Sequence, residues 1–257
     1  MDVVFVDSWR RINVWRQKVK ALTWKPILSN LAEANGELLI LLWRLHYLTF
    51  RELPEDCPRR SEASCLDWYA RQEELHPFAE GSLFVSLEHA YHHLNWAWNC
   101  RHASEDRVWH FAERDAKRWT RFPCTADFAN LWPLDGTVKV AKNDIGLIGS
   151  RKKISLFPLR PEIQHAQRKL TNLCRLVEKE CFGEDEVVPP KGMTADVWQQ
   201  PLTEKDFARR MHRIYDRLNT AWNCRMRKSY PKNSGRMFEQ IRCFSPCFAT
   251  GSHDMWR

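Results

Sequence analysis

The chain has 257 residues, of which 44% are hydrophobic and only nine are glycine, and its formal net charge is +8. This length allows one large domain or two of modest size, and nine glycines are few for a sheet-rich enzyme or a phosphate-binding loop. Stretches rich in Leu, Ala, Glu, Arg and Gln favour helices, so the expected fold class is mainly α.

The first part of the chain predicts helices separated by loops. Residues 8–24 have apolar side chains at three-to-four spacing, which predicts an amphipathic helix, and Pro26 can open the next element. We expect an apolar helix over residues 36–51 and a further helix over 61–75. The longest apolar run, Leu38–Trp43, is far shorter than the ~20 residues that span a bilayer.

The start of the chain has no features of a secretory signal. Acidic residues stand where such a signal has basic ones, and the apolar stretch is short. The chain has nine cysteines, an odd number, so free thiols are expected in place of a complete disulfide framework. We therefore expect a soluble, cytoplasmic protein.

A block of eleven residues occurs twice, 124 positions apart. The segment 91–101 recurs as 215–225 with eight identical residues, whereas chance would give about one. At the same offset Arg44, Arg51, Cys57 and Glu80 match Arg168, Arg175, Cys181 and Glu204. The sequence therefore predicts two diverged tandem helical repeats with a pseudo-two-fold organisation.

The remaining elements follow from this repeat. The repeated helix is expected to begin near Ser86 in the first copy and at Thr203 in the second, where Thr203 and Asp206 resemble a capping box. Further helices are predicted over 104–121 and 161–182, whereas 184–200 is predicted to be loop.

The predicted organisation has five parts. In chain order they are an N-terminal helical extension (1–36), a first repeat (37–124), a linker (125–160), a second repeat (161–247) and a tail (248–257). Within the linker, residues 137–141 and 153–157 alternate in polarity around a turn-forming segment. This pattern predicts a small β-hairpin.

The repeated helix has a wide face that carries polar residues. Buried amides need hydrogen-bond partners, and the matching arginines and glutamates are the candidates. The predicted polar network comprises Arg44, Arg51, Glu80, Asn95, Asn99, Arg101, Arg168, Arg175, Glu204, Asn219, Asn223 and Arg225. It either fixes how the helices pack or forms a pocket for a small anion or nucleotide.

A zinc site is an alternative for the first copy. His89, His93 and Cys100 share one sector of the helix, and Cys57 or Cys124 could supply a fourth ligand. The second copy has arginines in place of both histidines, and no Cys-x-x-Cys pair is present. The signal for zinc is therefore weak, and the main expectation is that the protein has no cofactor.

The second copy also has a basic stripe opposite its apolar face. Its members are Arg209, Arg210, Arg213 and Arg217, and Arg227 and Lys228 continue it. Such a stripe can follow a phosphate backbone, but it can equally be a solvated helix face. Together with the excess of arginine over lysine, it makes nucleic acid or an acidic protein a possible partner.

Sequence patterns typical of hydrolases, nucleoside triphosphatases and dinucleotide-binding enzymes are missing from the chain. The preferred function is therefore a non-catalytic basic accessory or binding module that engages nucleic acid or a nucleoprotein or other protein partner. Two alternatives stay open. One is a helical enzyme or a metal- or ligand-binding protein that uses the repeated polar residues. The other is a protein-interaction scaffold covered by the abundant Trp side chains.

Overall fold

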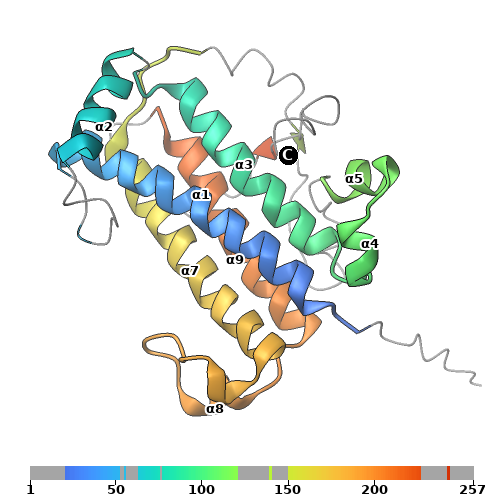
Figure 1. Cartoon of the computed structure of the whole chain (residues 1–257). Helices are drawn as coiled ribbons and strands as arrows, with labels where there is room; N and C mark the ends of the chain where they lie inside the picture. The colour runs from blue at the N-terminus through green and yellow to red at the C-terminus, as the bar shows by residue number, and fades with distance from the viewer. Residues whose placement is uncertain are drawn as a thin grey trace, which may run out of the picture.

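The computed structural model describes residues 21–52, 55, 63–75, 77–120, 139–140, 150–226 and 242–243. This part of the chain is mainly helical, which confirms the expected class. Four long helices lie side by side in Figure 1, namely α1 (Trp24–Phe50), α3 (Glu80–Asn99), α7 (Leu156–Phe182) and α9 (Glu204–Cys224). α1 packs on α3 and α7, α7 packs on α9, and α9 also contacts α3.

Shorter elements lie at the ends of these helices. α2 (Ala63–Leu75) follows α1, and α4 (Glu105–Trp109) and α5 (Glu113–Trp119) follow α3 (Figure 1). The connection from α7 to α9 contains a 3-10 turn, η2 (Glu184–Glu186), and the short helix α8 (Ala195–Gln199). None of the described helices is both long enough and apolar enough to cross a membrane.

α1 and α7 are long because a buried stripe continues through both at helical spacing. Each has 27 residues, and their buried positions lie 132 residues apart. The corresponding buried pairs are Pro26 and Pro158, Ile27 and Leu159, Leu31 and Ile163, Ala34 and Ala166, Leu38 and Leu170, Leu41 and Leu173, and Leu45 and Val177. α3 and α9 correspond at an offset of 124 residues.

One hydrophobic core joins two helix pairs, of which the first is α1 with α3 and the second is α7 with α9. Trp98 of α3 stacks on Phe207 of α9, with ring centroids 5.9 Å apart, and Phe84 meets Trp222 at 5.8 Å. All four side chains are nearly or completely buried. Removing such aromatic area from water contributes strongly to the free energy of folding, so the pairs depend on each other for their core.

The structure extends two of the predicted helices. α1 begins at Trp24 and so crosses the predicted boundary between the N-terminal extension and the first repeat, at 36–37. α7 begins at Leu156 and crosses the predicted boundary between the linker and the second repeat, at 160–161. Proline is tolerated in the first turn of a helix, so Pro26 and Pro158 do not interrupt either helix. The helix expected over 8–24 lies outside the described residues except for its last positions, of which 21–23 are not helical.

The predicted hairpin is not seen among the described residues. Lys139–Val140 pairs in parallel with Arg242–Cys243, and residues 153–155 form no strand. The apolar alternation over 153–157 instead leads into the buried stripe of α7. The helix predicted over 104–121 is also divided, because α4 ends at Trp109 and α5 begins at Glu113.

A buried lysine holds the α8 loop against the bundle. The Nζ atom of Lys179 donates to the carbonyls of Trp198 and Gln200 at 2.7 and 2.8 Å. It also lies 3.3 Å from a carboxylate oxygen of Glu180. A buried ammonium needs such partners to offset its desolvation, so this contact fixes the loop that leads into α9.

We expect the Lys179→Met variant to lower the free energy of unfolding by about 1–3 kcal/mol, since two buried carbonyls lose a charged donor. Urea denaturation monitored by circular dichroism measures this loss. Lys205→Met, at an exposed lysine, is the matched control. Equal denaturation midpoints for both variants would contradict a role of Lys179 in holding the loop.

Candidate functional site: an internal polar network and a basic helix face

Two reciprocal Tyr–Asn pairs join α3 and α9. The hydroxyl of Tyr91 donates to Oδ1 of Asn219, and the hydroxyl of Tyr215 donates to Oδ1 of Asn95 at 2.8 Å. The two tyrosine rings stack with centroids 5.6 Å apart, and all four residues are buried. Nδ2 of Asn95 donates to the carbonyl of Thr120 at 3.0 Å. The amides therefore have internal partners, as buried polar groups require.

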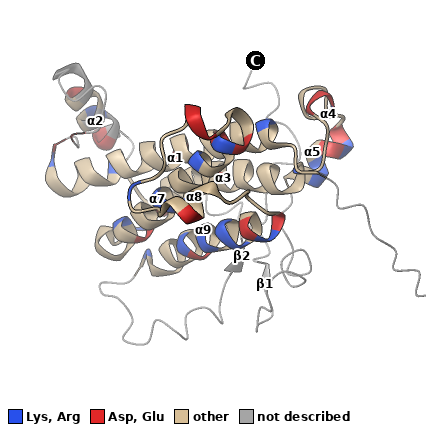
Figure 2. Cartoon of the chain, turned by 90° about the horizontal axis from the view of Figure 1, so that it is seen from below, with Lys and Arg blue, Asp and Glu red and all other residues tan. Residues whose placement is uncertain are grey.

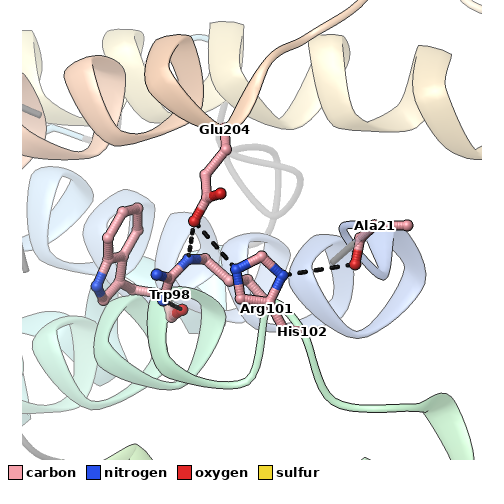
Figure 3. A network of polar contacts seen from close by, with 5 residues as sticks. All are labelled: Ala21, Trp98, Arg101, His102 and Glu204. Carbon is pink, nitrogen blue, oxygen red and sulfur yellow. Dashed lines mark hydrogen bonds and ion pairs between the residues drawn. The ribbon is translucent and has the colours of Figure 1, made fainter. Parts of the chain in front are cut away.

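Two reciprocal Arg–Glu pairs, which we call the clamps, join the ends of the same helices. Nε of Arg101, just after α3, donates to Glu204 at the start of α9 over 2.8 Å. Nε of Arg225, just after α9, donates to Glu80 at the start of α3, also over 2.8 Å. His102 adds to the first clamp, with its Nε2 atom 3.0 Å from Glu204 (Figure 3).

Each clamp arginine also stacks on a tryptophan one turn earlier. The guanidinium carbon of Arg101 lies 3.9 Å from the ring centre of Trp98, and that of Arg225 lies 3.5 Å from Trp222. Each guanidinium donates to the carbonyl of the same tryptophan, at 2.8 and 2.7 Å. A cation over an indole face is attracted to it, so the ring and the carboxylate together fix the arginine.

The clamps keep both glutamates ionised. Burial alone would raise the pKa of Glu80, but hydrogen bonds from Ser150 and Arg225 outweigh it and the pKa falls below its ordinary value. Burial is likewise the largest influence on the pKa of Glu204, and Arg101 and His102 reverse it. Each glutamate therefore stabilises the fold above its unfolded-state pKa, and this contribution is lost as the pH falls through the lower folded-state pKa.

Four arginines of the predicted network lie elsewhere. Arg44 pairs with Glu73 at 3.4 Å, Arg51 lies over the ring of Tyr47, Arg175 pairs with Glu178 on the surface of α7, and Arg168 is exposed. The reason is that corresponding positions of α1 and α7 are 132 residues apart, so matches at an offset of 124 do not occupy equivalent places there.

The two remaining predicted network residues, Asn99 and Asn223, differ in their partners. Nδ2 of Asn99 donates to the carbonyl of Trp119 at 3.1 Å, which ties α5 to α3. Nδ2 of Asn223 donates within its own helix to the carbonyl of Asn219 at 2.9 Å. The other residues of the predicted network therefore point into the protein. Their polar atoms form hydrogen bonds with neighbouring elements or with the helix to which they belong.

The predicted zinc ligands have different neighbours. Cys100 is fully buried beside Trp96, Val108 and Trp119, and burial raises the pKa of its thiol to about 12. His89 instead faces α1, with Nδ1 3.8 Å from Glu37. Among the described residues, no three His, Cys, Asp or Glu side chains cluster closely enough to hold a metal ion. Cys57 and Cys124 lie outside the described residues.

The basic stripe forms a surface that α7 shares with α9. Figure 2 shows Lys and Arg gathered along α9. Burial is the largest influence lowering the pKa of Lys169 in α7, and the charges of Arg213, Arg217 and Arg210 lower it further. We call these four residues, with the exposed Arg168, the basic face. Sequence reasoning missed Lys169, which lies in α7 about two helical turns after Glu162, the partner of Arg217.

Carboxylates neutralise only part of this surface. Arg217 pairs with the buried Glu162 at 3.0 Å, and Arg209 pairs with Asp206 at 3.1 Å. Within the described part of the chain, Arg213 and Lys169 form no ion pair within 4.0 Å. Arg227 and Lys228, the other predicted members, lie outside the described residues. Among the residues that the structure describes, the cations of the basic face therefore outnumber the carboxylates that pair with them.

The first helix pair has other residues at the corresponding positions. Glu37 corresponds to Lys169, His89 to Arg213 and His93 to Arg217. The neighbouring carboxylate of Glu37 raises the pKa of His89, whereas burial lowers the pKa of His93. Both helix pairs pack in the same way despite these differences, so packing does not require cations at these positions.

We expect Arg225→Met to lower the free energy of unfolding by about 3–5 kcal/mol, because it leaves the carboxylate of Glu80 buried without its guanidinium. Arg101→Met should cost less, since the side chain of Glu204 is 28% exposed and that of Glu80 is 1% exposed. Chemical denaturation at neutral pH measures both losses. Adding Glu80→Gln should restore part of the loss in Arg225→Met, and a further loss would contradict the clamp.

His89→Gln should destabilise the protein only where His89 is protonated. Its raised pKa means that its contribution is fully present below pH 6.5 and is lost as the pH rises through the folded-state pKa. Because the pair is partly exposed, the expected loss at acidic pH is at most about 1 kcal/mol. Urea midpoints on either side of this range measure it. A loss that is equal at acidic and alkaline pH would contradict the ion pair.

Comparison of the chain with protein-family models, with curated proteins and with solved structures gives no match.

Proposed function

We propose that this protein is a non-catalytic helical module that binds an anionic macromolecule, nucleic acid foremost, through the basic face. The observation that carries the proposal is the position of Lys169 among Arg210, Arg213 and Arg217. Like charges held together cost folding free energy, and a polyanion would offset this cost by neutralising them. Guanidinium groups suit this partner, since their planar donors match phosphate oxygens.

The first helix pair supports this proposal as an internal comparison. Where the second pair has Lys169 and Arg213, the first has Glu37 and His89, which pair with each other. The same packing is thus compatible with a neutralised surface. The excess of cations among the described residues of the second pair is therefore a property of its surface and supports an external anionic partner.

The internal network supports a role without catalysis. The Tyr–Asn pairs and the clamps direct their polar atoms at each other across α3 and α9. A catalytic group must reach its substrate, which these buried and mutually bonded side chains do not offer. Burial raises the pKa of Cys174 to about 12 and that of Cys181 to about 11, so neither thiol is activated as a nucleophile.

We further propose that the two helix pairs arose by tandem duplication and are related by a pseudo-two-fold axis. The reciprocal contacts support this origin, as do two backbone bonds at corresponding positions. The N–H of Thr23 donates to the carbonyl of Arg101 at 2.9 Å, and that of Ser155 donates to the carbonyl of Arg225 at 2.6 Å. The connection from α7 to α9 is eight residues shorter than that from α1 to α3, which accounts for the two offsets.

Charge reversal tests the basic face. We expect Lys169→Glu combined with Arg213→Glu to weaken nucleic-acid binding at least about tenfold at moderate salt. The salt dependence should fall by about one counterion for each lost phosphate contact. Fluorescence anisotropy with labelled single- and double-stranded DNA and RNA, titrated across salt, measures both.

Arg114→Glu combined with Lys117→Glu is the matched control, because it makes the same change in net charge on α5. This control should bind nearly as tightly as the original protein. Equal weakening by both pairs would mean that only net charge matters. Unchanged affinity in the Lys169 and Arg213 variant, or no binding by the original protein at low salt, would overturn the proposal.

A further inference from the structure

Charged residues of α7 and α9 lie at matching levels of the two helices. The start of α7 meets the end of α9, so the helices are antiparallel. Arg217 pairs with Glu162 at 3.0 Å, and this contact shows which turns meet. Seven residues are close to two helical turns, or about 10 Å along an axis. Two turns from this contact, Lys169 of α7 therefore lies level with the turn of α9 that holds Arg210 and Arg213.

The first helix pair shows how closely such positions approach each other. His89 corresponds to Arg213 and Glu37 to Lys169, and Nδ1 of His89 lies 3.8 Å from a carboxylate oxygen of Glu37. In the second pair both residues are cations. Burial lowers the pKa of Lys169, and the neighbouring arginines of α9 lower it further. A larger share of this amine is therefore neutral, and so nucleophilic, near neutral pH.

The amine of Lys169 can also be reached from solvent. Its side chain is only partly buried, and within the described part of the chain it forms no ion pair. Lys179, by contrast, is buried with its Nζ atom donating to two carbonyls. Lys25, Lys117 and Lys152 each lie within 4.0 Å of a carboxylate. Acceptors hold these four lysines, whereas Lys169 lies among donors.

We infer that Lys169 is an acylation site and that its acyl donor is an acyl phosphate. The guanidinium groups of Arg213 and Arg210 bind the phosphate, since their planar donors match its oxygens. The neutral amine attacks the carbonyl carbon, so that a C–N bond forms and the C–O bond to the phosphate breaks. Inorganic phosphate leaves with the electron pair of that bond, and the amine proton passes to solvent. The product is a neutral amide.

Acylation also regulates the basic face, a consequence that rests on the proposed function. It removes the positive charge of Lys169. Acylated protein should therefore bind nucleic acid less tightly, with a salt dependence lower by about one counterion. The acyl phosphate and the nucleic acid compete for the same arginines, so bound nucleic acid should protect Lys169 from acylation.

Incubation of the full chain with acetyl phosphate, followed by peptide mass spectrometry, tests the site. We expect Lys169 to be acetylated at least about tenfold faster than the exposed Lys191, because clustered cations concentrate an anionic reagent. Inorganic phosphate should slow the reaction at Lys169 by competition. With p-nitrophenyl acetate, an uncharged donor, the preference for Lys169 should be at least about threefold smaller, because this donor has no phosphate to bind.

Arg213→Gln tests the role of the neighbouring guanidinium. It should lower the rate with acetyl phosphate at Lys169 at least about threefold and leave the rate at Lys191 unchanged. Arg114→Gln, at an exposed arginine of α5, is the matched control and should change neither rate. Circular dichroism of each variant verifies that the fold is retained, which the exposure of both arginines favours.

The acylation site and the proposed function fail on different results. Equal rates at Lys169 and Lys191, no effect of Arg213→Gln, or an equal preference for Lys169 with the uncharged donor would overturn the site. The proposed function would survive these results if Lys169→Glu with Arg213→Glu still weakened nucleic-acid binding. Absence of nucleic-acid binding by the original protein at low salt would overturn the proposed function and its regulation, and the site would stand on its acetylation rates.

Discussion

The bundle depends on the clamps that join α3 to α9. A buried carboxylate is costly unless a charged partner and further hydrogen bonds offset its desolvation. Glu80 receives them from Arg225 and Ser150, and Arg225 is itself held over Trp222. Sliding α9 along α3 by a single turn would separate both clamps and both Tyr–Asn pairs at once. Hydrophobic packing alone tolerates such shifts more readily, so the polar contacts select one register of the helices.

The same register determines where the surface charges lie. α9 begins at Glu204 beside Arg101, and this fixes which turns of α9 meet α7. Arg217 is thereby brought to Glu162, and Arg213 to Lys169. The basic face is therefore built on two rigid helices whose relative position the core and the clamps enforce. The backbone that carries these residues is already ordered, so ligand binding restricts only their side chains.

The sequence predicted the parts of the structure that depend on local pattern. The repeated block identified α3 and α9 and their buried asparagines, and Thr203 caps α9 by accepting from the N–H of Asp206. The alignment of α1 with α7 was wrong, because the length of the connecting segment changes the offset between corresponding residues. Lys169 was missed because its proximity to Arg213 arises only from the antiparallel packing of two helices, which periodicity within one helix does not report.

Aromatic residues illustrate why burial has to be known before such a sequence can be interpreted. The chain has 13 Trp and 13 Phe, and this content by itself would suit a core, a protein interface or a nucleic-acid surface. Trp98, Phe207 and Trp222 are required by the core. Among the exposed aromatics of the described residues, Trp109 belongs to α4 and Phe182 to the far end of α7, whereas Phe157 shares a helix line with Arg168. The core therefore accounts for these large buried rings, whereas the exposed aromatics of the described part of the chain are distributed over α1, α2, α4 and α7 and form no single patch defined by sequence pattern.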